Sequence, residues 1–261
     1  MPKIGLVLGP GGAKGLAHIG VLKALIENKI PIDVITGISM GAIVGGFYAS
    51  GMGIDEIERV ALETNFKALV NRISFNRVIR ESILKGAKIR NFIESNLKAK
   101  KIEDFKIPFG CCATNLVNGE EIIFTKGEAA FAIDASSTLP GIFKPIEYKG
   151  MFLVDGGLVN PLPIDLAKKL GAEIIICVDV LSKFSINTTK PNLLNSALNT
   201  INAFEKRLAG FTIEKYGAEV VIQPDLKGYR AYQFNKAKEM IEIGEKEAEK
   251  QINSIKIIIN K

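Results

Sequence analysis

Ser39 is the residue of this sequence best placed to act as a nucleophile. It is the centre of residues 37–41, Gly-Ile-Ser-Met-Gly, which match the pattern G-x-S-x-G. This pattern needs a sharp turn from a strand into a helix, which exposes the serine hydroxyl while glycines relieve the crowding. The context agrees, because residues 34–38 are apolar and β-branched and residues 39–50 suit a helix. We predict a nucleophile elbow around Ser39 that comprises Gly37, Met40 and Gly41; a plain tight turn is the alternative.

A second glycine-rich turn, residues 9–15, lies at an equivalent strand-to-helix junction. Glycines there allow backbone N–H groups to approach an anion closely. A dinucleotide-binding fingerprint fails because Lys14 stands where its third glycine is needed, and a P-loop fails because Gly15 follows that lysine. A structural turn and an oxyanion hole for a charged carbonyl oxygen remain as interpretations. The candidate residues of the hole are Gly11, Gly12, Ala13, Lys14 and Gly15.

Two residues compete for the role of the base that would activate Ser39. His18 is the only histidine, and it lies among apolar residues where a histidine is more often part of the core. Asp155 follows the apolar run 151–154 and precedes Gly156 and Gly157. Shielding from water can raise the pKa of an aspartate toward that of a useful base, although Asp-Gly pairs are also common in turns. The residue types alone leave this choice open.

The elements that must position these residues alternate between strands and helices. Strands are expected at 3–8, 34–38, 107–116, 120–125, 151–154, 173–180 and 218–223, and helices at 13–28, 39–50, 54–68, 89–98, 128–136, 163–170, 193–209 and 231–254. Asn118-Gly119 between two of these strands predicts a hairpin. Successive strand–helix units indicate a parallel sheet covered by helices. We therefore expect an α/β fold of three layers, α/β/α, with a central, mostly parallel sheet in a single domain, residues 1–261.

Residues 34–54 form an uncharged run that is long enough to span a membrane. However, the run holds six glycines and begins with strand-like residues, so a buried strand and helix explain it better. The first ten residues are interpreted as a buried strand and not as a signal peptide. Three cysteines, two of them adjacent, make no disulfide framework, which favours the cytoplasm as location.

The charge of the chain is concentrated in residues 66–106. The whole chain has 34 basic and 28 acidic residues, a formal charge of +6, and this stretch alone has eleven basic against four acidic residues, a net charge of +7. Basic residues interleaved with apolar ones suit peripheral contact with an anionic membrane or a cover over an acyl pocket. The alternatives are an ordinary solvated surface and the contact of a homodimer. No nucleic-acid binding is expected, since no recognisable module is present.

The motifs together resemble the patatin-like phospholipases, particularly the small bacterial members. The resemblance rests on residues 11–22, on the pentapeptide 37–41 and on the Asp-Gly-Gly of residues 155–157, with further similar blocks at 140–145 and 160–163. These blocks occur in order between residues 3 and 180. The C-terminal extension, residues 181–261, is compatible with the family and less diagnostic.

This resemblance implies a serine–aspartate dyad that needs no histidine and hydrolyses acyl esters of lipids. Ser39 would attack the acyl carbonyl, Asp155 would accept its proton, and Gly11 and Gly12 with neighbouring N–H groups would hold the oxyanion. An acyl-serine intermediate would then be cleaved by water, with no metal or other cofactor. Two departures concern the oxyanion hole. Pro10 replaces the family's first loop glycine and removes a donor, and Lys14 replaces an arginine.

The expected function is therefore that of a serine hydrolase acting on phospholipid, lysophospholipid or simple carboxylic esters. A soluble thioesterase or carboxylesterase would use the same two residues with a different pocket. A catalytically silent adaptor that kept the fold for protein contacts is a third reading, and a nucleotide-binding protein is a more distant one. The sequence specifies neither the acyl chain length nor the oligomeric state.

Overall fold

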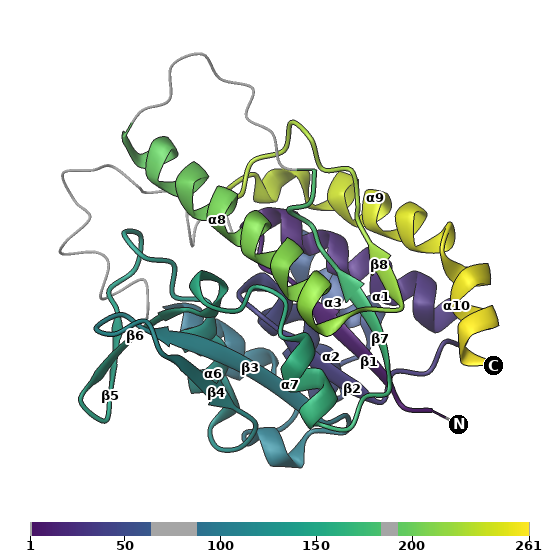
Figure 1. Cartoon of the computed structure of the whole chain (residues 1–261). Coiled ribbons are helices and arrows are strands. Elements are labelled where there is room, and N and C mark those ends of the chain that lie inside the picture. The colour runs from purple at the N-terminus through teal and green to yellow at the C-terminus, as the bar shows by residue number, and fades with distance from the viewer. Residues whose placement is uncertain (1, 64–87, 184–192, 261) are drawn as a thin grey trace.

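The structure is a computed structural model that describes residues 2–63, 88–183 and 193–260 (Figure 1). Its centre is an eight-stranded sheet in the order β5-β6-β3-β2-β1-β7-β8, with β4 also paired to β3. Strands β1, β2, β3, β7 and β8 run parallel, whereas β4, β5 and β6 join by antiparallel pairs. The predicted, mostly parallel sheet is confirmed. The strands are β1 (Ile4–Leu8), β2 (Val34–Gly37), β3 (Phe109–Asn115), β4 (Glu121–Phe124), β5 (Ile146–Tyr148), β6 (Met151–Asp155), β7 (Ile174–Val178) and β8 (Val220–Ile222).

Helices cover both faces of this sheet, so the predicted three layers are confirmed. Helices α7 and α8 pack on one face and enclose a smaller apolar core, while α1, α2, α6 and α9 enclose the main core on the other (Figure 1). The helices are α1 (Ala17–Glu27), α2 (Met40–Ser50), α3 (Ile54–Glu63), α6 (Ala129–Ser136), α7 (Ile164–Lys169), α8 (Leu193–Tyr216), α9 (Ala237–Glu249) and α10 (Ile252–Ile259). Short 3₁₀ helices include η1 (Gly12–Leu16), η3 (Ile102–Asp104), η4 (Gly156–Leu158) and η5 (Phe234–Lys236).

The central strands are apolar throughout because neither of their faces meets water. Every residue of β1, β2 and β7 is buried. Parallel strands that lie between two helical layers read as continuous apolar runs, without the alternation of a half-exposed strand. Burial on both faces thus explains why these strands have continuous apolar sequences.

Several element boundaries differ from those that the sequence predicts. The helix expected over 13–28 begins as the 3₁₀ helix η1 and becomes α-helical only at Ala17. The helix expected over 231–254 is divided into η5, α9 and α10. Helix α8 runs on to Tyr216, past the expected end at 209. The hairpin at Asn118-Gly119 is confirmed, since β3 and β4 pair antiparallel and Gly119 has the positive φ of 75° that such a turn needs.

The long uncharged run forms β2 and α2, as expected for a buried strand and helix. Ten of the eleven residues of α2 are buried, so the absence of charge reflects the protein core. In the described ranges, no helix is long and apolar enough to cross a bilayer.

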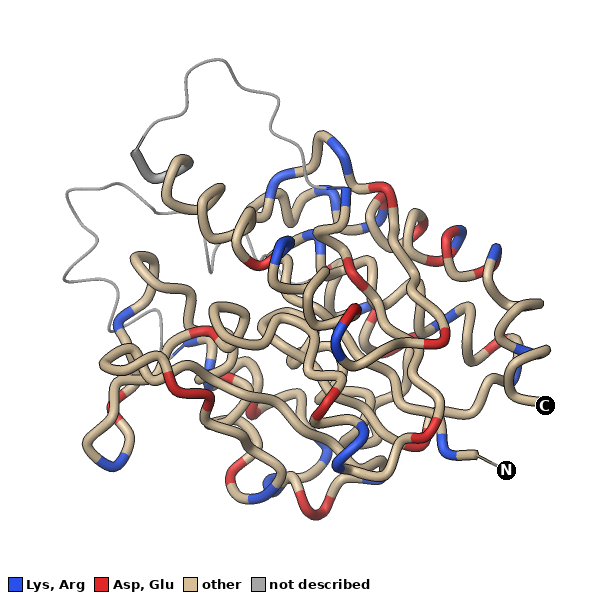
Figure 2. The backbone as a smooth tube through the Cα atoms, viewed as in Figure 1, with Lys and Arg blue, Asp and Glu red and all other residues tan. Residues whose placement is uncertain are grey.

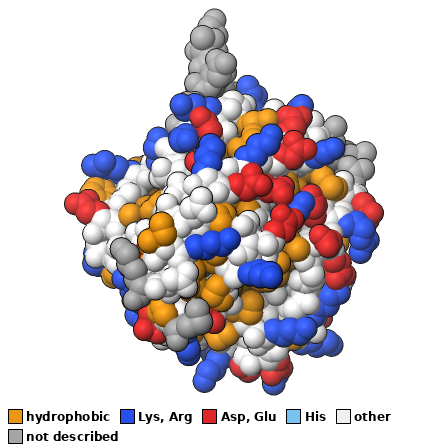
Figure 3. Space-filling model, turned by 90° about the vertical axis from the view of Figure 1, so that its right-hand side faces the viewer, with side chains coloured by type: hydrophobic (Ala, Val, Ile, Leu, Met, Phe, Trp, Pro, Cys, Tyr) orange, Lys and Arg blue, Asp and Glu red, His pale blue; other side chains and the backbone are white. Residues whose placement is uncertain are grey.

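Charges of both signs are mixed over the part of the surface that the figures show. Basic and acidic residues are both distributed along the chain (Figure 2). The face in Figure 3 likewise has hydrophobic side chains scattered between basic and acidic ones. Of the basic stretch 66–106, residues 66–87 lie outside the described residues. The predicted membrane, cover and dimer roles of that stretch therefore stay predictions.

Two glycines allow α1 and α9 to cross in very close contact. A Cβ atom at Gly20 would lie 1.9 Å from the carbonyl oxygen of Ile241, and one at Gly244 would lie 2.0 Å from that of Ala17. Backbone atoms cannot move aside as flexible side chains can. We therefore expect Gly244→Ala to lower the free energy of unfolding by at least about 2 kcal/mol, measured by urea denaturation.

Gly210→Ala provides the matched control for this prediction. Gly210 lies inside α8 and has no atom within 4 Å of the position of an added Cβ. Alanine there should raise the free energy of unfolding by about 0.5–1 kcal/mol, because it restricts the unfolded chain and favours a helix. Equal effects of the two substitutions would contradict the close helix crossing.

Candidate active site

Ser39 lies in the sharp turn between β2 and α2, as the sequence predicts. Its backbone has φ 56° and ψ −124°, a conformation that non-glycine residues rarely adopt and that costs on the order of 1–3 kcal/mol. The side chain makes no capping hydrogen bond to the helix, and the residue is half-buried. The hydroxyl is therefore not engaged in holding α2 together, although the residue occupies the position where serine usually caps a helix.

The glycines on each side of Ser39 are required by close backbone packing. A Cβ at Gly37 would lie 2.4 Å from the carbonyl oxygen of Gly41, and one at Gly41 would lie 2.2 Å from that of Leu8. Both distances are shorter than any real Cβ contact. The strand-to-helix turn can thus be this tight only with glycine at both positions.

Asp155 lies at the end of β6 and is almost fully buried, with 1% of its surface exposed. One carboxylate oxygen, Oδ1, accepts a hydrogen bond from the N–H of Gly157 at 2.9 Å. The carbonyl oxygen of Asp155 accepts a bond from the hydroxyl of Thr114 at 2.8 Å. The side chain of Asp155 is thereby directed by its own backbone contacts and by the 3₁₀ turn η4 that follows.

The second carboxylate oxygen of Asp155, Oδ2, is buried and has no partner within normal hydrogen-bond geometry among the described residues. Ser39 is nevertheless close enough for its hydroxyl to lower the pKa of this carboxyl. The contact between the two side chains is therefore looser than a normal hydrogen bond, which is common for catalytic pairs without substrate. A buried carboxyl group with one oxygen unoccupied and a serine hydroxyl within reach has the parts that a general base requires.

Burial raises the pKa of Asp155 from 3.8 to about 6, although the hydroxyl of Ser39 and the N–H of Gly157 act in the opposite direction. Loss of water penalises the charged carboxylate more than two donors can stabilise it. A carboxyl with this pKa is ionised near neutral pH and still basic enough to accept a proton.

One short segment, residues 136–138, binds the backbones of both Ser39 and Asp155 and so fixes their positions relative to each other. The N–H of Ser39 donates to the carbonyl oxygen of Ser136 at 3.2 Å, and the N–H of Asp155 donates to that of Thr138 at 2.8 Å. The hydroxyl of Ser137 donates to the carbonyl oxygen of Ser39 at 3.1 Å. Sequence reasoning did not select residues 136–138, because their function depends on backbone groups that any residue possesses.

His18, the other candidate for the base, has a different place in the structure. It is fully buried on α1, and its Nε2 lies 2.8 Å from the carbonyl oxygen of Gly9. Because a carbonyl oxygen can only accept, Nε2 must be the protonated nitrogen. Burial lowers the pKa of His18 to about 4, with only partial compensation from the bond to Gly9. The ring is therefore neutral near pH 7, and its hydrogen bond to Gly9 holds the start of the glycine-rich turn in place.

The glycine-rich turn packs directly against the elbow. A Cβ at Gly15 would lie 2.6 Å from the Cβ of Met40, the residue that follows Ser39. Gly12 has a φ of 55°, and a Cβ there would lie 2.5 Å from the carbonyl oxygen of Ala231. These close approaches explain why glycines occupy the turn and show that it lies beside the serine.

The N–H groups of this turn differ in what they bind. The N–H of Ala13 donates to the carbonyl oxygen of Ala231 at 2.7 Å, and that of Lys14 donates to Gly11 at 3.1 Å. Within the described ranges, no acceptor is bonded to the N–H groups of Gly11 and Gly12. Lys14 itself is buried, with 2% of its surface exposed, and burial lowers the pKa of its amine. Gly11 and Gly12 are thus the loop residues with donors available for an anion.

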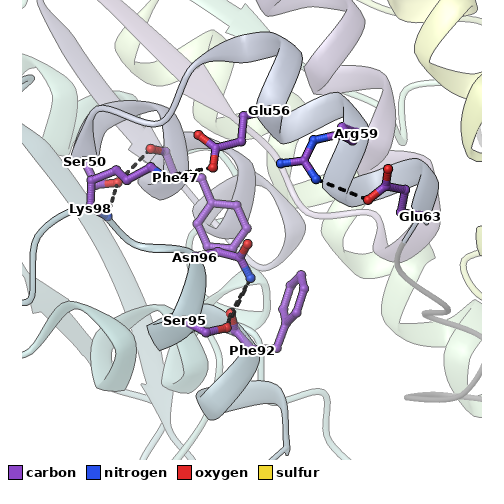
Figure 4. A network of polar contacts seen from close by, with 9 residues as sticks. All are labelled: Phe47, Ser50, Glu56, Arg59, Glu63, Phe92, Ser95, Asn96 and Lys98. Carbon is purple, nitrogen blue, oxygen red and sulfur yellow. Dashed lines mark hydrogen bonds and ion pairs between the residues drawn. The ribbon is translucent and has the colours of Figure 1, made fainter.

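An apolar hollow with about 260 Å³ of empty space, open to solvent, begins at Met40 and extends between α1, α2 and α3. Helical residues 88–96 close one side, where the rings of Phe47 and Phe92 meet edge to face with centroids 6.0 Å apart (Figure 4). Nearby, the amine of Lys98 pairs with Glu56 of α3 at 2.9 Å (Figure 4). The hollow is lined by Leu16, Ile19, Met40, Ile43, Val44, Phe47, Ile57, Val60, Ala61 and Phe92.

The part of the chain that the structure describes contains no group of three or more His, Cys, Asp or Glu side chains that could hold a metal ion. One acidic residue that the sequence did not single out does lie at the site. Glu205 of α8 is buried next to Gly157, so two carboxyl groups flank the turn that follows β6. Nothing in its local sequence distinguishes it from the exposed acidic residues of a surface helix.

Comparison with known proteins gives relatives over most of the chain. Residues 6–168 match the family model described as patatin-like phospholipase. The chain is 30% identical over 277 aligned residues to lysophospholipase NTE1 of Kluyveromyces lactis, covering 92% of this chain and 18% of that protein. It is 36% identical over 179 residues to an NTE family protein of Mycobacterium bovis, covering 69% of this chain and 49% of that one. The chain thus spans less than half of the length of these relatives.

Solved structures with the same fold are more distant in sequence. VipD from Legionella pneumophila superposes with a TM-score of 0.54 at 14% identity, covering 97% of this chain and 67% of that one. The type III effector protein ExoU gives a TM-score of 0.53 at 15% identity, with 97% and 53% covered. These likenesses concern the fold, whereas the family match also spans the elbow and the Asp-Gly-Gly turn. The chain belongs to the patatin-like phospholipase family.

Proposed function

We propose that this protein hydrolyses acyl esters of lipids, with Ser39 as nucleophile and Asp155 as general base. The observation that carries the proposal is the pairing of a serine held in a strained turn with a buried carboxyl group, one oxygen of which has no hydrogen-bond partner among the described residues. Family membership and the relatives named as lysophospholipases support the substrate class. The substrate of this chain is a proposal, since the relatives are longer proteins.

The reaction begins when the hydroxyl oxygen of Ser39 attacks the ester carbonyl and its proton passes to Oδ2 of Asp155. The negative charge that develops on the carbonyl oxygen is stabilised by the N–H groups of Gly11 and Gly12, which donate to no acceptor in the described parts of the chain. The tetrahedral intermediate collapses, the ester bond breaks, and the protonated Asp155 returns the proton to the leaving alkoxide. An acyl-serine remains.

Water completes the cycle by the reverse sequence of proton transfers. Asp155 removes a proton from the water that attacks the acyl-serine, and the same N–H groups hold the second oxyanion. Collapse releases the fatty acid and returns the proton to Ser39. His18 takes no part, because its protonated nitrogen already donates to Gly9.

The apolar hollow beside Met40 supports an acyl chain as the group that the site accepts. Its lining is apolar throughout, and it begins one residue from the nucleophile. We therefore propose that the acyl chain of the substrate lies in this hollow.

The test is hydrolysis of p-nitrophenyl esters of increasing chain length and of lysophospholipid, by the wild type and by Ala61→Leu. The larger side chain should fill the hollow and lower kcat/KM for an octanoyl ester roughly tenfold relative to an acetyl ester. Ala203→Leu on the exposed face of α8 is the matched control and should leave the preference unchanged. A wild type that hydrolyses none of these esters would favour the catalytically silent adaptor. Activity on monomeric esters alone would favour the soluble esterase.

A further inference from the structure

Helix α8 buries a carboxyl group where a helix of its kind normally buries apolar side chains. Glu205 is 4% exposed, whereas the adjacent Phe204 is 71% exposed and Phe211 is 49% exposed. A buried, ionisable side chain costs free energy unless it has a partner. Helix α8 also lies outside residues 6–168, the region that the family model matches. The reason for this burial must therefore lie in what Glu205 touches.

Glu205 touches the turn that fixes the orientation of Asp155. Its Oε1 lies 2.3 Å from the position of a Cβ on Gly157, and Oδ1 of Asp155 lies 3.2 Å from the same point. The two carboxyl oxygens are therefore no farther apart than the sum of these distances, 5.5 Å. Between them, the N–H of Gly157 donates to Oδ1 of Asp155 at 2.9 Å. A larger residue at 157 would push these groups apart.

The described residues around this pair do not supply a neutralising cation. No basic side chain forms an ion pair with Glu205 among the described residues. Strand β3 contributes Cys112, whose thiol stays protonated because burial raises its pKa. Helix α6 contributes Asp134, which is already paired with Arg90 at 3.0 Å.

Other charged groups that the structure describes on the neighbouring helices are likewise engaged or face solvent. On α7, the amine of Lys169 pairs with Asp165 at 3.1 Å. On α8 itself, Lys206 acts on the buried Asp179 at the end of β7, where it opposes the effect of burial on the pKa. Arg207 stacks on Phe211 at the exposed surface.

Two carboxyl groups this close and this buried cannot both be ionised near neutral pH. Burial and the nearby Asp155 raise the pKa of Glu205 well above its usual value. Asp155 loses its proton first, since its pKa is raised only to about 6 and two donors stabilise its charge. The pair then consists of the carboxylate of Asp155 and the neutral acid of Glu205.

We propose that Glu205 is a positioning residue for the ester hydrolysis proposed above, a carboxylic acid that keeps its proton while Asp155 is the working carboxylate. In this form it packs against Gly157 without repelling Asp155. When Glu205 loses its proton at alkaline pH, the two carboxylates repel each other across Gly157. The repulsion turns Asp155 away from Ser39, and hydrolysis declines.

The first test compares the pH dependence of kcat/KM for the wild type, Glu205→Gln and Glu214→Gln on a p-nitrophenyl ester. Glutamine has the size of the protonated acid but cannot ionise, and Glu214 is an exposed residue of the same helix. The rate of Ser39→Ala is subtracted at each pH. As the pH rises above neutral, we expect kcat/KM to fall in the wild type and in Glu214→Gln, and not to fall in Glu205→Gln. Equal profiles of the wild type and Glu205→Gln would overturn the proposal.

The second test needs no activity and therefore separates this inference from the proposed function. A carboxyl with a raised folded-state pKa stabilises the protein fully below its unfolded pKa, and this stabilisation is lost as the pH rises through the folded pKa. The urea midpoint of Glu205→Gln should thus exceed that of the wild type increasingly toward alkaline pH. A lower midpoint at alkaline pH would mean that Glu205 acts as an anion, and the proposal would be wrong. A wild type without Ser39-dependent hydrolysis would instead contradict the proposed function.

Discussion

Replacing Ser39 with alanine is expected to reduce ester hydrolysis by a factor on the order of 10⁴ or more. The reason is the loss of the only hydroxyl that interacts with the carboxylate of Asp155 in the described structure. The turn itself should persist, because alanine meets the same steric limits at φ 56° as serine does. Initial rates and labelling with a fluorophosphonate probe, followed by mass spectrometry, measure the effect.

Ser95→Ala is the control for this experiment. Ser95 is an exposed serine in the helical segment 88–96, and its hydroxyl donates to the carbonyl oxygen of Phe92. This variant should hydrolyse the ester and be labelled as the wild type is. If Ser39→Ala kept more than about a hundredth of the wild-type rate, the nucleophile would have to be another residue.

The sequence predicted those parts of the fold that local rules determine. Gly37 is needed by a contact within the turn, with Gly41, so part of the elbow is determined by its own five residues. Gly41 is needed by a contact with Leu8 of β1, which the pentapeptide alone does not reveal. The Asn118-Gly119 hairpin follows from the φ that such a turn requires. The parallel sheet was predicted because short apolar runs alternate with segments of helical periodicity. Strands that are buried on both faces have such continuous apolar sequences.

Other parts of the site depend on contacts between residues far apart in the chain. The N–H of Ala13 donates to the carbonyl oxygen of Ala231, more than two hundred positions away, whereas the N–H groups of Gly11 and Gly12 have no acceptor among the described residues. Glu205 is recognised only once α8 is seen against Gly157. A periodicity predicts that α8 is a helix, but it does not predict which distant turn the helix will cover.

Replacing Asp155 with asparagine is expected to lower kcat/KM by about 10³- to 10⁴-fold and to stabilise the protein at neutral pH. Asparagine can still accept the hydrogen bond from Gly157, so the turn should be retained. It cannot accept the proton of Ser39, so attack on the ester is lost. The wild-type rate should rise with pH through about 6, the pKa of Asp155, because only the ionised carboxyl is a base.

The stability of Asp155→Asn follows from the same raised pKa. Wild-type stabilisation from Asp155 is complete below the unfolded pKa near 3.8 and is lost as the pH rises through about 6. Removal of the buried charge should then raise the free energy of unfolding at pH 7 by roughly 2–3 kcal/mol, the equivalent of about two pKa units. Urea denaturation of both proteins at about pH 4 and about pH 7 measures this difference.

Asp134→Asn tests whether the loss of activity in Asp155→Asn is specific to Asp155 or follows from the removal of any buried carboxyl group. Burial raises the pKa of Asp134 to about 6 as well, against the opposing effect of Arg90, so its titration would overlap that of Asp155. Asp134→Asn should retain hydrolysis and the rise of the rate through pH 6, since Asp155 still supplies the base. If the rise disappeared in Asp134→Asn while Asp155→Asn stayed active, the base would be Asp134. If Asp134→Asn and Asp155→Asn both lost activity and stability to the same extent, the two carboxyl groups would have structural roles. Asp155 would then not be the general base.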